Sequence, residues 1–121
     1  MRAHDGEATL GVRTIKGDFE RALADISQVI SFRPDSERIA YAYDARALVY
    51  LKMGQPADGL ADADRAIELR SNVGGYYITR AHLHEALGSK DEAIADLRHA
   101  LKLSPGRTDI HIELKRLGVE P

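Results

Sequence analysis

The stretch "GLADADRAIEL" (residues 59–69) decides the fold, because it returns elsewhere in the chain in slightly altered form. The segments "RALADISQVI" (21–30) and "EAIADLRHAL" (92–101) repeat its order of small, apolar and acidic residues. Taken alone, Asp62 and Asp64 would suggest a metal site or acid–base chemistry. Recurrence of the whole phrase favours a repeated structural unit instead, since similarity at a fixed spacing is the signature of repeat architectures.

The repeat period is 34 residues, the distance between Gly54 and Gly88. On that offset, segment 40–73 aligns with segment 74–107. Eight positions are identical: Tyr43/Tyr77, Arg46/Arg80, Ala47/Ala81, Gly54/Gly88, Ala61/Ala95, Asp62/Asp96, Ala66/Ala100 and Leu69/Leu103. A third copy lies upstream, where residues 17–34 align with 54–71 at an offset of 37 residues. The chain therefore contains three related units.

Each unit is predicted to form two helices. Ser36 and Thr108 are expected N-caps, and Gly54 and Gly88 are expected helix stops. The predicted helices span about 18–32, 36–53, 56–70, 74–87, 90–103 and 108–118. The last of these lies beyond the repeats and is expected to cover the open edge of the stack.

The opening helix of the first unit is predicted to be weak. Its segment "GEATLGVRTIK" (6–16) contains two glycines, each costing about 1 kcal/mol relative to alanine in a helix. We expect one domain over 1–121. Its predicted parts are a first repeat at about 3–36, a second at 40–73, a third at 74–107 and a capping helix at 108–118.

The 34-residue helix–turn–helix period and the residues within it resemble the tetratricopeptide repeat family. The family's pattern of aromatic, large-plus-small pair and aromatic is matched in "YDARALVY" (43–50) and, with His84 as a departure, in "YITRAHLH" (77–84). Gly59 stands where the family usually has alanine, which should loosen that helix slightly. The resemblance covers about 17–107. It implies an all-α, right-handed superhelical solenoid of about three helix pairs plus a C-terminal capping helix.

The resemblance also implies a function: binding of a protein or peptide partner in a concave groove, without catalysis. The candidate groove residues are Tyr41, Asp44, Leu48, Leu51, Ile78, His82 and Glu85. Chaperone-binding members of the family clamp a terminal carboxylate with lysine, asparagine and arginine. The matching places here hold Glu7, Gly11, Ala45, Gly75 and Thr79, so an acidic chaperone tail is an unexpected ligand. We expect a peptide with an apolar anchor and a basic residue.

The repeated charged residues are expected to be structural. Asp62 recurs as Asp25 and Asp96, and we predict that Arg46 and Arg80 each meet one of these carboxylates between packed helices. Asp64 is expected to be a solvated surface residue, because it lies about 200° around the helix from Asp62. Tyr43 and Tyr77 are expected to wedge between helices.

The remaining features point away from other classes of function. His82 and His84 lie on different helix faces, so they are not expected to chelate a metal. No cofactor motif is present, and no nucleophile–base set marks an enzyme. Charged residues make up 30% and the net charge is −2, which does not favour nucleic acid.

The chain has no cysteine and no apolar run long enough for membrane insertion. The N-terminus lacks an apolar signal core, so we expect a cytoplasmic protein, or a periplasmic or secreted one whose leader has been removed. The alternative function is self-association, in which the terminal edges assemble a homodimer or a larger complex.

Overall fold

The computed structural model describes the backbone of residues 2–121 and the side chains of residues 15–121. Six helices follow one another along the chain, and this part of the chain contains no strand. They are α1 (Arg2–Ser31), α2 (Ser36–Lys52), α3 (Pro56–Leu69), α4 (Gly74–Ala86), α5 (Lys90–Leu103) and α6 (Thr108–Arg116). The predicted all-α fold is confirmed, and five of the six helices begin and end close to their predicted bounds.

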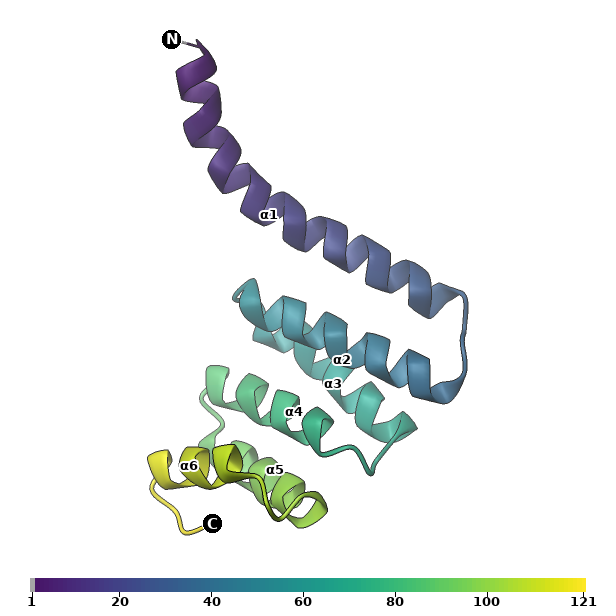
Figure 1. The fold of residues 1–121 in the computed structure, drawn as a ribbon, viewed down its shortest axis with the longest axis vertical. Helices are drawn as coiled ribbons and strands as arrows, with labels where there is room; N and C mark the ends of the chain where they lie inside the picture. Colours follow the sequence, from purple (N-terminus) through teal and green to yellow (C-terminus); the bar gives the residue numbers. More distant parts are fainter. Residues whose placement is uncertain (1) are drawn as a thin grey trace.

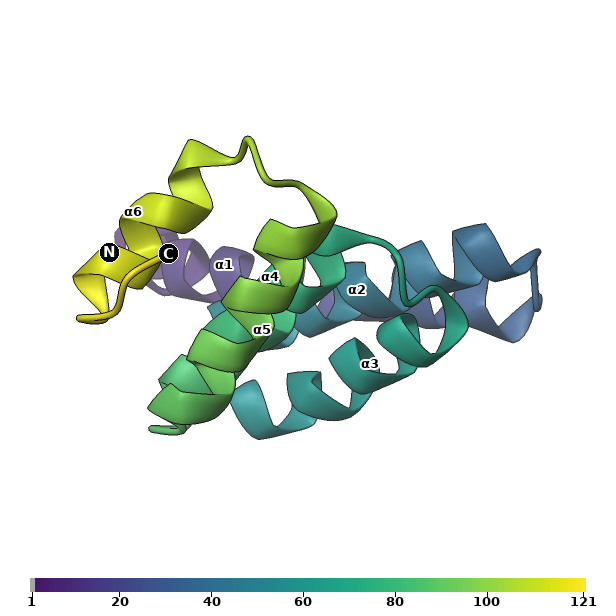
Figure 2. The same cartoon turned by 90° about the horizontal axis from the view of Figure 1, so that it is seen from below.

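The helices stack in chain order from α1 to α6 (Figure 1). The pairs α2–α3 and α4–α5 are each joined by a short turn, and Figure 2 shows the second pair lying at an angle to the first. Such a stack of rotated pairs is a helical-repeat solenoid. No described helix combines the length and the apolar character required to cross a membrane.

The first unit differs from the predicted helix pair, because α1 runs from Arg2 to Ser31 without a turn at Gly17. Gly54 and Gly88 stop their helices in the left-handed region, with φ of 75° and 81°. Gly17 instead stays helical. A glycine in a helix costs about 1 kcal/mol, which weakens a helix but does not end it unless the following residues start a new one. The N-terminal half of α1 therefore continues away from the stack (Figure 1).

Two predicted caps are displaced by one residue. Asp35, not Ser36, caps α2, and its carboxylate accepts the Arg38 amide at 3.0 Å. Before α6 the N-cap is Arg107, and Thr108 is already helical. Asp is at least as good an N-cap as Ser, so either neighbour could have taken the role at α2.

Small residues let the paired helices approach closely. Ala47 of α2 and Ala63 of α3 are fully buried, and a Cβ added to Gly59 would lie 2.8 Å from the Ala47 carbonyl oxygen. The close packing of α2 and α3 therefore requires glycine at position 59, a role beyond the slight loosening of the helix that the sequence predicts. The α4–α5 pair uses Ala81 and Ala93 in the same way, each 1% exposed.

The terminal helix α6 covers the end of the stack, as predicted. Its apolar residues Ile110 and Leu114, with Leu117 directly after the helix, are buried in one core cluster with Tyr77 and Leu97. This burial positions the polar side of α6 next to α4.

Candidate functional site

Two repeated ion pairs hold each first helix to its second helix. The Arg46 guanidinium of α2 donates to both carboxylate oxygens of Asp62 at 2.7 and 2.8 Å. One repeat later, Arg80 of α4 donates to both oxygens of Asp96 at 2.8 and 2.8 Å. The hydrogen bonds to these carboxylates raise the pKa of both arginines above the ordinary value, against the effect of burial. The predicted pairing of the two arginines with Asp62 and Asp96 is confirmed.

Each arginine also reaches back to the preceding helix. Arg46 donates to the Ser27 hydroxyl of α1 at 3.1 Å, and Arg80 donates to Asp64 of α3 at 3.1 Å. Asp64 is exposed, as predicted, and its rotation away from Asp62 also turns it toward Arg80 of the next unit. Ser27 and Asp64 are 37 residues apart, the offset at which the first two units align. The second half of α1 therefore stands in the place of a second helix, as α3 does.

Tyr43 and Tyr77, which occupy the same position in the second and third repeats, lie beside these ion pairs. The guanidinium carbons of Arg46 and Arg80 lie 5.5 and 5.7 Å from the ring centroids of Tyr43 and Tyr77. Tyr77 is buried, donates its hydroxyl to the Ser71 carbonyl at 2.9 Å and stacks on His99 at 4.1 Å. These contacts are structural, which agrees with the predicted wedging role.

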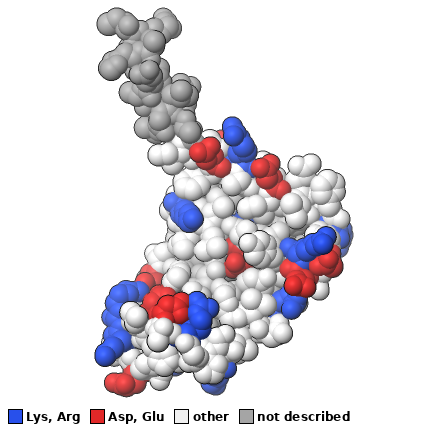
Figure 3. All heavy atoms as spheres, viewed as in Figure 1, with Lys and Arg blue, Asp and Glu red and all other residues white. Residues whose placement is uncertain are grey.

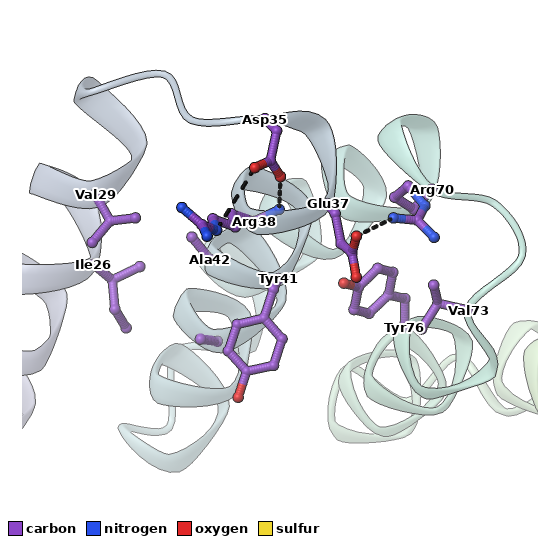
Figure 4. Close-up of a pocket in the computed structure, with 11 residues that line it drawn as sticks. Ile26, Val29, Asp35, Glu37, Arg38, Tyr41, Ala42, Arg70, Val73 and Tyr76 are labelled. Carbon is purple, nitrogen blue, oxygen red and sulfur yellow. Dashed lines mark hydrogen bonds and ion pairs between the residues drawn. The ribbon is translucent and has the colours of Figure 1, made fainter.

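A hollow of about 800 Å³ opens between α1, α2 and the start of α4 (Figure 4). Its apolar lining comes from three elements, with Ile26 and Val29 on α1, Tyr41 on α2 and Tyr76 on α4. Tyr41 is 68% exposed, although an aromatic ring is costly to leave in water. Pockets that bind ligands have comparable volumes and mainly apolar walls with a few polar groups.

The charged groups around this hollow are balanced. Asp35 lies 3.7 Å from Arg38, and Glu37 lies 3.6 Å from Arg70. Figure 3 shows the same mixture on the face in view, where groups of both signs are separated by a broad uncharged area. The hollow therefore offers apolar area and paired charges rather than a field of one sign.

The predicted groove residues of the second unit differ in burial and in what they contact. Tyr41 lines the hollow, Leu48 is half-buried, and Leu51 packs against the core cluster of Ala47, Ala63 and Leu83. Asp44 is half-buried, and its Oδ1 has no hydrogen-bond partner among the described residues 15–121. Burial raises the pKa of Asp44, with the Thr79 hydroxyl acting in the opposite direction.

The predicted groove residues of the third unit are engaged by α6 or by the core. His82 Nε2 lies 2.9 Å from Glu113 Oε1, and Arg116 donates to Glu85 at 2.8 Å. Ile78 packs against the core cluster that contains Ile110. Of the seven predicted residues, Tyr41 lines the hollow, whereas His82 and Glu85 pair with residues of α6.

Sequence reasoning missed residues at two places, the contact between α4 and α6 and the hollow between α1, α2 and α4. Glu113 and Arg116 lie 34 residues after Thr79 and His82, so extending the repeat alignment into the terminal helix would have located them. Ile26, Val29 and Tyr76 carried no such signal. Their meeting depends on how the second half of α1 packs against α2. Among residues 15–121 no group of three metal-ligating side chains forms.

Comparison with known proteins agrees with this architecture. Residues 75–107 match the family model of the tetratricopeptide repeat. The DnaJ homolog subfamily C member 7 homolog of Schizosaccharomyces pombe is 32% identical over 106 residues, covering 87% of this chain and 22% of that protein. Protein unc-45 homolog B of Mus musculus is 31% identical over 100 residues, covering 83% of this chain and 11% of that protein. The chain thus spans 11 to 22% of the length of these curated relatives.

Solved structures match over almost the whole chain. The Arabidopsis OM64 TPR domain has a TM-score of 0.76 at 26% identity, with 98% of this chain and 96% of that one covered. The second TPR domain of human RPAP3, solved in complex with the HSP70 peptide SGPTIEEVD, has a TM-score of 0.73 at 24% identity, covering 99% and 98%. The first TPR of Spaghetti (RPAP3), bound to the HSP90 peptide SRMEEVD, has a TM-score of 0.76 at 20% identity, covering 88% and 82%.

A repeated helix pair that buries small residues and joins its helices by arginine–aspartate pairs defines a helical-repeat interaction domain. The chain belongs to the tetratricopeptide repeat family.

Proposed function

We propose that this domain binds a peptide segment of a partner protein in the hollow between α1, α2 and the start of α4, and that it catalyses no reaction. The observation that carries the proposal is Tyr41, which projects into an apolar hollow of about 800 Å³ while 68% exposed. Exposed aromatic side chains in such hollows commonly supply most of the binding energy of an interface.

The structural relatives support peptide binding as a class of function. Two of them were solved with the peptides SRMEEVD and SGPTIEEVD, which end in acidic residues. In this chain, Ala45 lines the hollow where a cation would be needed, and Thr79 donates its hydroxyl to the Gly75 carbonyl at 3.1 Å. Neither residue can neutralise a carboxylate, which argues against the same ligands here.

The preferred ligand is therefore a peptide with an apolar anchor and a basic residue. The anchor would pack on Tyr41 and on Leu48, which lies about two turns further along the same face of α2. The basic residue would lie near Asp44, whose half-buried carboxylate has no partner for Oδ1 in the described part of the chain. The arginines around the hollow already face Asp35 and Glu37, so the unpaired charge on this side is negative.

A peptide-array screen followed by titration of selected peptides tests this function. Tyr41→Ala is expected to abolish selected binding while leaving the stability within about 0.5 kcal/mol, as for other exposed positions. Ile112→Ala on α6 is the matched control, because Ile112 is also 68% exposed but lies outside the hollow. Selection of acidic C-terminal peptides, or binding that survives both Tyr41→Ala and Leu48→Asp, would refute the proposal.

A further inference from the structure

One face of α1 matches the faces by which α3 and α5 receive their partner helices. Ala22, Ile26 and Val29 correspond at the 37-residue offset to Gly59, Ala63 and Ala66 of α3. In turn, these three correspond at the 34-residue offset to residues of α5, namely Ala93, Leu97 and Ala100. The residues of α3 and α5 in this set are all buried. On α1, by contrast, Val29 is 45% exposed, and Ala22 and Ile26 are only half-buried.

The carboxylate of this face is also uncovered. Asp25 occupies the position of Asp62 and Asp96, each of which takes two hydrogen bonds from an arginine on the first helix of its unit. Asp25 is exposed, and no described side chain between residues 15 and 121 pairs with it. The face therefore has both the apolar surface and the acidic group of a helix-binding site.

The chain itself does not supply the matching arginine. The residue 37 positions before Arg46 is Thr9, and the segment that contains it continues α1 as one helix. In a second copy of the chain, the two arginines at this place of the repeat, Arg46 and Arg80, are already bound to Asp62 and Asp96.

We propose that this face of α1, at the edge of the hollow, is the docking site for a helix of a partner protein that carries an arginine followed by a small residue. The arginine binds Asp25, and the small residue packs on Ala22, as Ala81 packs opposite Ala93. An aromatic residue three positions before the arginine fits the arrangement of Tyr77 and Arg80. This inference rests on the proposed function and specifies its ligand as a helix.

The helix α4 provides a ready probe, because its partner α5 presents alanine, leucine and alanine where α1 presents Ala22, Ile26 and Val29. A labelled peptide of residues 74–87, "GGYYITRAHLHEAL", would be titrated into the full chain by fluorescence anisotropy. Since a helix of this length is marginal in water, the peptide is stapled on the side away from the arginine. We expect saturable binding.

Two substitutions identify the pair. Asp25→Asn in the protein, or Arg80→Ala in the peptide, should weaken binding at least about tenfold, which equals about 1.4 kcal/mol. Glu20→Gln is the control, because Glu20 is exposed on α1 but lies about 140° around the helix from Asp25. Asp25→Arg combined with Arg80→Asp in the peptide should restore binding, which a merely structural role of Asp25 would not do.

Helix docking on α1 and Tyr41-dependent peptide binding in the hollow can fail independently. Binding that ignores Asp25, or no binding of the probe at all, overturns the helix-docking site. Peptides that still bind in a Tyr41-dependent manner would then leave the proposed function standing. Concentration-dependent dimerisation that Asp25→Asn abolishes, measured by sedimentation of the chain alone, would also overturn the assignment to a different protein.

Discussion

Replacing Arg80 by alanine is the most direct test of what holds the units together. Arg80 joins three helices, since it lies on α4, donates to Asp96 of α5 through two bonds and to Asp64 of α3 through one. Its side chain is 25% exposed and that of Asp96 is 8% exposed. Removing the guanidinium therefore leaves a buried carboxylate with the ring nitrogen Nε2 of His84 at 3.8 Å.

The expected loss of stability is about 3 kcal/mol. Breaking a buried ion pair by removing one partner costs roughly 3–5 kcal/mol, because the remaining charge loses its compensation. The lower end applies because Arg80 retains some contact with water, which screens the pair. Arg46→Ala should cost somewhat less, since Arg46 meets one carboxylate and the neutral Ser27.

Urea unfolding followed by circular dichroism measures this loss, with Arg65→Ala as control because Arg65 is 52% exposed and only approaches Glu68 at 3.8 Å. A double-mutant cycle with Asp96→Ala should give a coupling energy of about 2 kcal/mol. If Arg80→Ala destabilised the domain no more than Arg65→Ala, or if the coupling were near zero, the pair would not hold α4 to α5.

Three further changes have defined outcomes. Burial raises the pKa of Asp44, so its ionised carboxylate destabilises the folded state. The free energy of unfolding should therefore fall as the pH rises from 3.8, the ordinary pKa, through the raised pKa of the folded state. Urea unfolding at a series of pH values measures this fall, and Asp44→Asn should remove it. Gly59→Ala should destabilise by about 1 kcal/mol, since a clash with the Ala47 carbonyl costing roughly 1–3 kcal/mol outweighs the gain in helix propensity; a raised melting temperature would contradict the close approach. Leu114→Ala should cost about 2–5 kcal/mol and expose α6 to proteolysis, whereas an unchanged cleavage pattern would mean that α6 does not depend on its apolar face.

The candidate site was predictable only in part. The repeat alignment located the arginine–aspartate pairs, because each partner lies at a fixed place in a unit and the packing within a unit repeats. It could not locate the hollow, since Ile26, Tyr41 and Tyr76 belong to three different elements. The family resemblance places His82 and Glu85 in the predicted groove, and it did not include the ion pairs that these residues form with Glu113 and Arg116.

The amino-acid sequence by itself determined the helices from residue 36 onward, their pairing and the family. Local signals were sufficient there: small residues at fixed spacing, glycines at the stops and a period of 34 residues. Only the tertiary structure decided the form of the first unit and the shape of the surface. The glycine cost at Gly17 is about 1 kcal/mol, too small to settle locally whether a helix continues or turns. Whether α1 continues as one helix through Gly17, and hence whether Asp25 and Val29 remain uncovered, depends on contacts between elements far apart in the chain.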